Sequence, residues 1–313
     1  MERIKYLAAS QALTVPLSSV HESETRQWER RKEALDFLKI TSRGHEFERE
    51  YKLERIQVLK TFRSWLENLN SAYIVDQKEA LSEKVHEWDG YVFVDVESDR
   101  VSGLEELARK VSSAENLVAL FDEWRNESST FHEDFLGELE GQAKIYLRAH
   151  FEWFKAAAQG DMGALLSTPI IEHMRQQLPK KTNLESGLLV CRNFFKSEHF
   201  AKVPLHSITC RTHATLKHEV MLGAYVQRDK ALVKLRGYYT DLDHIAHYAP
   251  YCDAIAIDNA MAELMKKPSV ALSENYAVKV FSLNTADDFH AWLDEIEASI
   301  TDEHHEALLA AYG

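Results

Sequence analysis

The sequence lacks the features of a membrane or secreted protein. It has no run of about eighteen apolar residues, so it predicts no transmembrane helix. Its first fifteen residues lack a signal-peptide core, because Gln11 and charged residues interrupt the apolar stretch. Only three cysteines occur, Cys191, Cys210 and Cys252, and none has CxxC spacing. This favours reduced thiols over a disulfide framework or a zinc site, and we expect a cytoplasmic protein without membrane contact.

The common catalytic loops are also absent. The sequence contains no Walker loop, GxGxxG, nucleophile elbow or HExxH, which argues against the most frequent nucleotide-binding and hydrolase classes. Basic residues are in deficit, since 37 Lys and Arg face 50 Asp and Glu for a net charge of −13. Proteins that coat duplex DNA are normally basic. A local basic patch can still bind a nucleic-acid substrate while acidic residues hold a metal.

The chain has enough apolar residues, 45% of 313, to build one large domain or two smaller ones. Apolar periodicity predicts helices over residues 1–13, 20–40, 45–69, 76–88, 102–124, 128–158, 167–178, 184–195, 205–226, 230–235, 259–266 and 285–300. Residues 13–20, 254–257 and 276–283 read as strands, and 91–96 is ambiguous. Strand-prone runs lie near both ends of the chain. This predicts one α/β unit from residues 1–64 and 200–313, with a helical insertion at 65–199.

Acidic residues surround the strand-prone run at 254–257. Asp241 and Asp243 begin a short helical run, Pro250 ends it, and Asp258 follows the apolar run. Ligands of open α/β sheets bind outside the carboxyl ends of parallel strands. Carboxylate oxygens there suit Mg²⁺ or Mn²⁺. The alternative is structural, because acidic residues are also common as helix caps and in first turns.

The run TDLDHIAHYAPYCDAIAIDNAMAEL resembles the end of PIN-like nuclease domains, and residues 15–25 resemble a strand and helix of the same family. The resemblance implies a parallel sheet flanked by helices, in a chain that is helix-rich overall. It also implies Mg²⁺- or Mn²⁺-dependent hydrolysis of phosphodiesters, with RNA favoured over DNA. Position by position, the metal ligands are Glu24, Asp241 (with Asp243 as its close alternative) and Asp258.

The sequence departs from the family at one point. PIN-like domains begin with a strand that ends in a central metal-binding Asp, and no such Asp precedes Pro16. We expect either a start codon set too far downstream or a degenerate site. A degenerate site corresponds to an alternative function, an inactive PIN-like scaffold whose helical insertion binds a protein partner.

Other residues near the acidic ones are candidates for substrate contacts. Arg26, Arg30 and Arg31 lie close to Glu24 in the sequence and are the best candidates to bind a phosphate backbone, although such charges more often form a solvated face. His244 can orient a carboxylate or carry a proton.

Aromatic residues are concentrated at the end of the predicted helix 128–158. Phe151, Trp153 and Phe154 can in principle stack on bases. Packing between helices is the more common role of such a cluster, and we expect it here.

Overall fold

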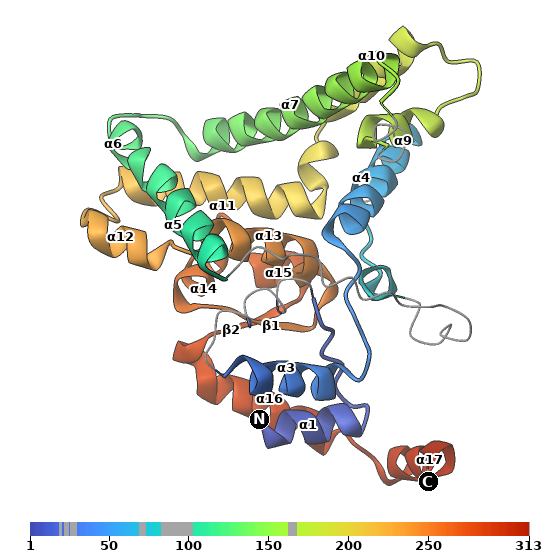
Figure 1. Cartoon of the computed structure of the whole chain (residues 1–313), viewed down its shortest axis with the longest axis vertical. Helices are drawn as coiled ribbons and strands as arrows, with labels where there is room; N and C mark the ends of the chain where they lie inside the picture. Colours follow the sequence, from blue (N-terminus) through green and yellow to red (C-terminus); the bar gives the residue numbers. More distant parts are fainter. Residues whose placement is uncertain are drawn as a thin grey trace.

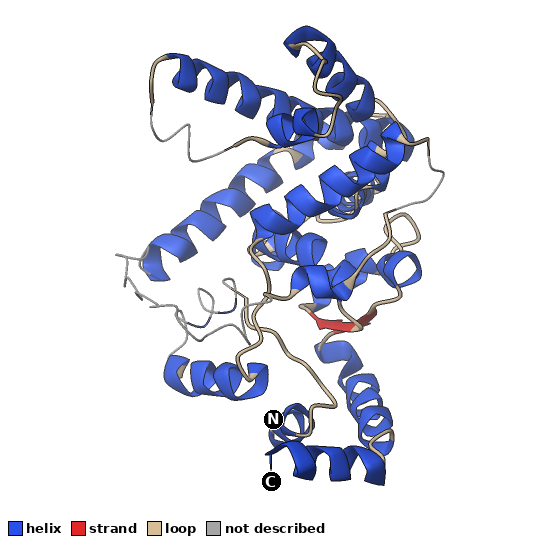
Figure 2. Ribbon diagram, turned by 90° about the vertical axis from the view of Figure 1, so that its right-hand side faces the viewer, coloured by secondary structure: helices blue, strands red, loops and turns tan. Residues whose placement is uncertain are grey.

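The computed structural model describes residues 1–18, 21, 25, 30–68, 73–82, 103–161 and 168–312. The described α-helices are α1 (Glu2–Ala9), α3 (Arg31–Ser42), α4 (Glu50–Leu66), α5 (Gly103–Ala119), α6 (Phe121–Trp124), α7 (Phe131–Ala158), α9 (Ile170–Gln176), α10 (Leu184–Phe195), α11 (Pro204–Met221), α12 (Arg228–Lys234), α13 (Tyr238–Tyr248), α14 (Asn259–Met265), α15 (Leu272–Tyr276), α16 (Ala286–Ala298) and α17 (Asp302–Tyr312). The strands are β1 (Ala254–Ala256) and β2 (Lys279–Phe281). Helices dominate, and the small sheet lies between the large helical layers and the helices near both termini (Figures 1 and 2).

The long helix α7 begins with a strong sequence signal. Thr130 and Glu133 form a capping box, in which each side chain accepts a hydrogen bond from the other residue's backbone N–H. Buried residues then recur along one face of α7, namely Phe135, Leu139, Ala143, Tyr146 and His150. This face packs against α11, which lies beneath α7 in Figure 1. Pro204 at the first position of α11 fits a helix start, where no backbone donor is needed.

One continuous apolar core joins the helical layers to the sheet. It runs from Val58 on α4 through the α7 and α11 interface to Val280 on β2. Aromatic rings fill its centre, where Phe194 lies 5.2 Å from Phe62 and 5.7 Å from Phe200 between ring centroids. Edge-on contacts of this kind add stability beyond the burial of area.

The sheet is a parallel pair. Ala254, Ile255 and Ala256 of β1 are in register with Lys279, Val280 and Phe281 of β2. Helices α14 and α15 connect the two strands, as a parallel pair requires. Helix α16 covers β2, with Trp292 5.5 Å from Phe281 between ring centroids.

The structure confirms a helix-rich α/β chain. Both C-terminal strands are present, although β1 is only partly buried, and β2 is shorter than predicted because Tyr276 still belongs to α15. In the described part of residues 13–20, strand pairing is limited to one bridge from Leu17 to Glu46. Residues 91–96 lie outside the described part of the chain.

Four expectations were wrong in detail. The region 102–124 forms two helices, and α17 follows the helix that was expected to be the last. Phe151 and Phe154 are 63% and 51% exposed, because the buried face of α7 ends at His150. Residues 77–80 form a short 3₁₀ turn where a helix over 76–88 was expected, and residues 83–88 lie outside the described part of the chain.

Two other sequence expectations concern thiols and membranes. Cys191, Cys210 and Cys252 are all free thiols, as predicted. None of the described helices combines the length and apolar character needed to cross a bilayer.

Candidate functional site

Asp241 lies in the first turn of α13, which begins after Gly237. A Cβ atom at Gly237 would lie 2.6 Å from Asp241 Oδ2, so the carboxylate of Asp241 lies directly against the backbone of Gly237. The Asp241 carboxylate therefore lies over the start of its own helix. The positive end of the helix dipole favours an acidic residue there.

Asp243 is the most open acidic residue of α13, with 61% of its side chain exposed. Its Oδ1 lies 3.3 Å from Nδ1 of His247, which also lies 2.8 Å from the backbone oxygen of Asp243. Burial alone would lower the pKa of His247, but the hydrogen bond and the charge of Asp243 outweigh it and raise that pKa. The carboxylate of Asp243 thus has one buried partner and remains accessible to solvent.

His244 faces the amino-terminal segment. Its ring centroid lies 5.3 Å from that of His21, in an edge-on contact, and 4.9 Å from that of Tyr248. Burial lowers the pKa of His244 to about 3, so the ring is neutral near pH 7. Among the described residues, its Nδ1 has no hydrogen-bond partner. The contact brings His21, three positions before Glu24 in the sequence, against α13.

Asp258 lies at the carboxyl end of β1. The preceding Ile257 donates its N–H to the carbonyl of Phe281 at 2.9 Å, which extends the parallel ladder to the edge of the sheet. The exposed Asp258 side chain caps α14, where Oδ1 accepts the N–H of Met261 at 2.7 Å. Asp258 thus has a structural role as a helix cap.

The arginines predicted to bind phosphate lie far from Asp241, Asp243 and Asp258 along the sequence. Arg31 begins α3 and is exposed, and Arg30 pairs with Glu33 one turn further on. Helix α3 packs against α1. Glu24 and Arg26 lie outside the described residues.

The chemistry of these acidic residues suits a magnesium or manganese ion. The exposed carboxylates of Asp243 and Asp258 are the hard oxygen donors that these ions prefer. Within the described part of the chain, no three side chains of His, Cys, Asp or Glu gather closely enough to hold an ion. The expected set also includes Glu24, which lies outside that part, so the metal site stays a prediction.

A buried polar chain links α4, α7 and α11. The hydroxyl of Tyr146 donates to Glu54 Oε1 at 2.7 Å and lies 2.8 Å from Nε2 of His206. Burial lowers the pKa of His206 to about 3, so its ring is neutral. Since the tyrosine donates to Glu54, Nε2–H of His206 must donate to the tyrosine oxygen. These hydrogen-bonded side chains could not be predicted from the sequence, because they lie far apart in it.

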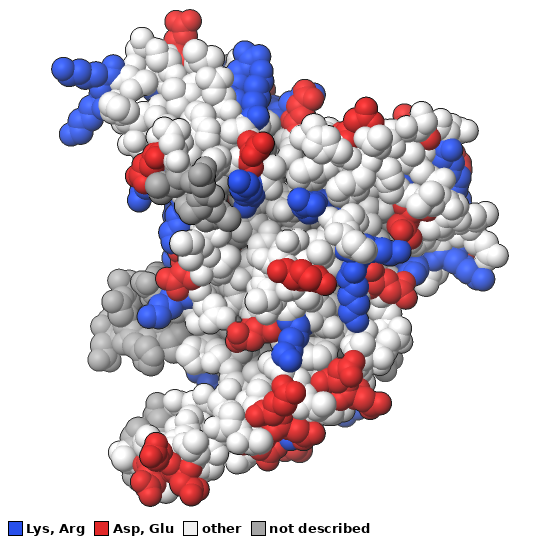
Figure 3. Space-filling view, turned by 180° about the vertical axis from the view of Figure 1, so that it is seen from behind, with Lys and Arg blue, Asp and Glu red and all other residues white. Residues whose placement is uncertain are grey.

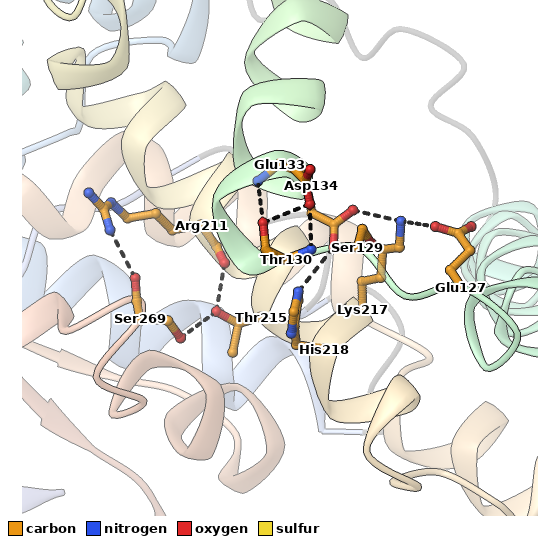
Figure 4. Close-up of polar contacts among 10 residues, drawn as sticks. All are labelled: Glu127, Ser129, Thr130, Glu133, Asp134, Arg211, Thr215, Lys217, His218 and Ser269. Carbon is orange, nitrogen blue, oxygen red and sulfur yellow. Dashed lines mark hydrogen bonds and ion pairs between the residues drawn. The ribbon is translucent and has the colours of Figure 1, made fainter.

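A second polar cluster joins the start of α7 to α11 (Figure 4). Asp134, only 8% exposed, accepts hydrogen bonds from Lys217 Nζ at 2.7 Å, His218 Nε2 at 3.1 Å and Ser129 Oγ at 2.9 Å. Lys217 also pairs with Glu127. The acceptors and donors are matched inside the cluster, so its charges are occupied in holding the two helices together.

A pocket of about 740 Å³ opens between the α11–α12 loop and α14. Its charged lining residues are Glu219, Lys230, Lys234, Glu263, Lys266 and Lys267. Basic side chains gather on this side of the molecule, at the right of Figure 3, whereas acidic ones dominate the lower part over α16 and α17. The sequence analysis missed the pocket, although the run RDKALVKLR over residues 228–236 is a local basic signal in an acidic chain.

Comparison with known proteins finds no matching family model, no matching curated relative and no matching solved structure.

Proposed function

We propose that the protein is a PIN-like, metal-dependent nuclease that hydrolyses phosphodiester bonds of RNA. The observation that carries the proposal is the order of elements around the sheet. Helix α13 bears Asp241 and Asp243 in its first turns and leads into β1, and β1 ends at an exposed Asp258 beside its parallel partner β2. This edge is where open α/β sheets bind their ligands.

The contact between His21 and His244 supports the metal site that the proposal requires. It links His21, three positions before Glu24 in the sequence, to the helix that carries Asp241 and Asp243. Glu24, Asp241 or Asp243, and Asp258 would hold Mg²⁺ or Mn²⁺, and a bound ion would supply activation of water and charge stabilisation. His244, neutral near pH 7, would contact the substrate as a hydrogen-bonding group.

The test compares the two acidic residues at opposite ends of β1. Asp258→Asn removes a ligand charge but keeps a good helix cap, because asparagine caps as well as aspartate. Losing an outer-shell partner of a metal site already costs 10–100-fold, so losing a ligand should slow cleavage by roughly 100-fold or more. The assay follows labelled single-stranded RNA and DNA in Mn²⁺, with an EDTA control.

Asp253→Asn is the matched control. Asp253 precedes β1, is exposed and accepts a hydrogen bond from Gln77, so its substitution should leave the rate of cleavage unchanged. Thermal melts of both variants should stay near that of the wild type. Full activity in Asp258→Asn would exclude this site, and cleavage of DNA alone would exclude RNA as the substrate.

A second candidate function is an inactive PIN-like scaffold. It is favoured by the exposed apolar side chains on α7, where Ile145, Phe151 and Phe154 face solvent in the described structure. A protein partner would bury such side chains. A folded wild-type chain that cleaves neither RNA nor DNA in Mn²⁺ or Mg²⁺ would favour the scaffold over the nuclease.

A further inference from the structure

The pocket between the α11–α12 loop and α14 has four lysines and two glutamates in its charged lining. Lys234 pairs with Glu263 at 3.0 Å, and Lys267 pairs with Glu219 at 2.9 Å. Lys230 and Lys266 are exposed and have no ion-pair partner among the described residues. The charged lining thus has a positive excess in a chain whose net charge is −13.

The wall of the pocket is held in a fixed shape. Tyr225 has a positive φ of 58°, which is unfavourable for a residue with a large side chain. Its carbonyl accepts a hydrogen bond from Arg125 Nη2 at 2.9 Å, and its ring lies 5.5 Å from the ammonium group of Lys234. Strained backbone of this kind persists where the surroundings support it, often at binding sites.

The floor of the pocket is also tied down. Lys266, Lys267 and Pro268 line the pocket and lead into Ser269. The carbonyl of Ser269 accepts from Arg211 Nη1 at 3.2 Å, and its hydroxyl lies 2.7 Å from that of Thr215 (Figure 4). Both partners belong to α11, so this side of the pocket is anchored to that helix.

The pocket lies beside the edge of the sheet. Helix α14 begins at its cap, Asp258, and ends at the lysines of the pocket. The hydrogen bond to Glu263 raises the pKa of Lys234, and the charge of Asp258 adds a smaller contribution. A polyanion that occupies the pocket would therefore extend along α14 towards Asp258.

We propose that this pocket binds the phosphodiester backbone of single-stranded RNA, with Lys230 and Lys266 as the principal phosphate contacts. The inference rests on the proposed nuclease function, since it supplies the substrate-binding surface for the edge at Asp258. Lysines bind phosphates as point charges without reading sequence, so binding should depend strongly on salt and weakly on base composition. The volume of about 740 Å³ lies in the range typical of small-molecule sites and can hold a nucleotide.

The experiment measures binding without cleavage. The fluorescence anisotropy of a short labelled single-stranded RNA is recorded in EDTA with the wild type and with Lys230→Glu/Lys266→Glu. We expect the variant to bind about tenfold more weakly at low salt, because two phosphate contacts are lost and two repulsive charges are added. The slope of log K against log salt should become shallower by about 1.4, since each phosphate contact contributes about 0.7 for a single strand.

The matched control is Lys180→Glu/Lys181→Glu, which makes the same change in net charge on an exposed loop before α10. We expect about a twofold change in affinity for this variant. Equal losses in both variants, or no loss in the pocket variant, would overturn the inference. Competition by polyglutamate as effective as that by unlabelled RNA would overturn the assignment to nucleic acid.

The outcomes also separate this inference from the nuclease proposal. If the wild type cleaves RNA and the pocket variant binds and cleaves like it, the pocket is not the binding site but the nuclease stands. If the pocket variant loses binding while no variant cleaves RNA in Mn²⁺, the binding site stands without the nuclease. Thermal melts of the pocket variant should match the wild type, because neither lysine has a partner to lose among the described residues.

Discussion

Helix α11 carries charged residues into two different surroundings. Towards α7, Lys217 and His218 both contact the nearly buried Asp134, and Lys217 has Glu127 as a second partner. Near the end of α11, Glu219 lines an open pocket in which Lys230 and Lys266 have no partner among the described residues. The same residue types thus occur in a closed cluster and at an open surface. Burial and the number of partners decide whether a charge supports the fold or is available to a ligand.

The largest expected effect comes from disrupting the closed cluster around Asp134. Asp134→Ala removes the carboxylate shared by Lys217, His218 and Ser129, and leaves a mostly buried ammonium group with only Glu127. We expect the free energy of unfolding to fall by about 3 kcal/mol, as for other broken buried ion pairs. Urea denaturation measures this change in the free energy of unfolding.

Glu152→Ala is the control on the same helix. Glu152 is exposed on α7, so its removal should change the free energy of unfolding by no more than about 0.5 kcal/mol. If Asp134→Ala were as mild as this control, the cluster at Asp134 would not be the structural clamp that its geometry indicates.

A second prediction uses the buried polar chain in the helical layers. The folded pKa of His206 is about 3, whereas its ordinary value is 6.5, so protons bind the unfolded state first. The stability that this residue contributes is complete above pH 6.5 and is lost as the pH falls towards 3. Between pH 7 and pH 5 the loss should be about 2 kcal/mol.

His206→Gln isolates that contribution. Glutamine keeps a donor for the Tyr146 hydroxyl but does not titrate, so the variant should lose less stability than the wild type over this pH range. Other buried histidines titrate in both proteins and cancel in the difference. Identical pH profiles from urea denaturation would contradict a neutral, buried His206.

The smallest expected effect concerns the open pocket lined by Glu219. Glu219→Gln removes the partner of Lys267 from a partly exposed pair, which should change the free energy of unfolding by less than about 0.5 kcal/mol. It should also raise the affinity for single-stranded RNA about twofold, because a negative charge leaves the pocket. Urea denaturation and anisotropy test the two effects. Destabilisation as large as that of Asp134→Ala would show that the pocket is a closed structural cluster.

Apolar periodicity predicted most of the helices, and the structure shows further local signals where some of them begin. The capping box at Thr130, Asn183 as the cap of α10 and Pro204 at the start of α11 act within one helical turn, so they can be read from neighbouring residues. The apolar runs that became β1 and β2 were equally visible. Helix α17 was missed, and the ends of several helices were misplaced by a few residues.

The sites depended on residues that are far apart in the sequence. Lys217 meets Asp134 across 83 positions, and Tyr146 meets His206 across 60, so neither cluster has a local pattern. The pocket likewise joins α12 to the end of α14 through tertiary packing. The sequence did identify Asp258 at a strand end, because this property depends on adjacent residues. The roles of Glu24, Asp241 and Asp243 as metal ligands stay predictions.

The most direct test of the account measures binding and cleavage on one labelled single-stranded RNA. Anisotropy in EDTA gives the affinity, and cleavage in Mn²⁺ gives the rate, for the wild type, Asp258→Asn and Lys230→Glu/Lys266→Glu. We predict that Asp258→Asn binds RNA like the wild type but does not cleave it. The lysine variant should bind weakly and regain cleavage as the RNA concentration rises. A folded wild-type protein that neither binds nor cleaves the RNA would contradict the account.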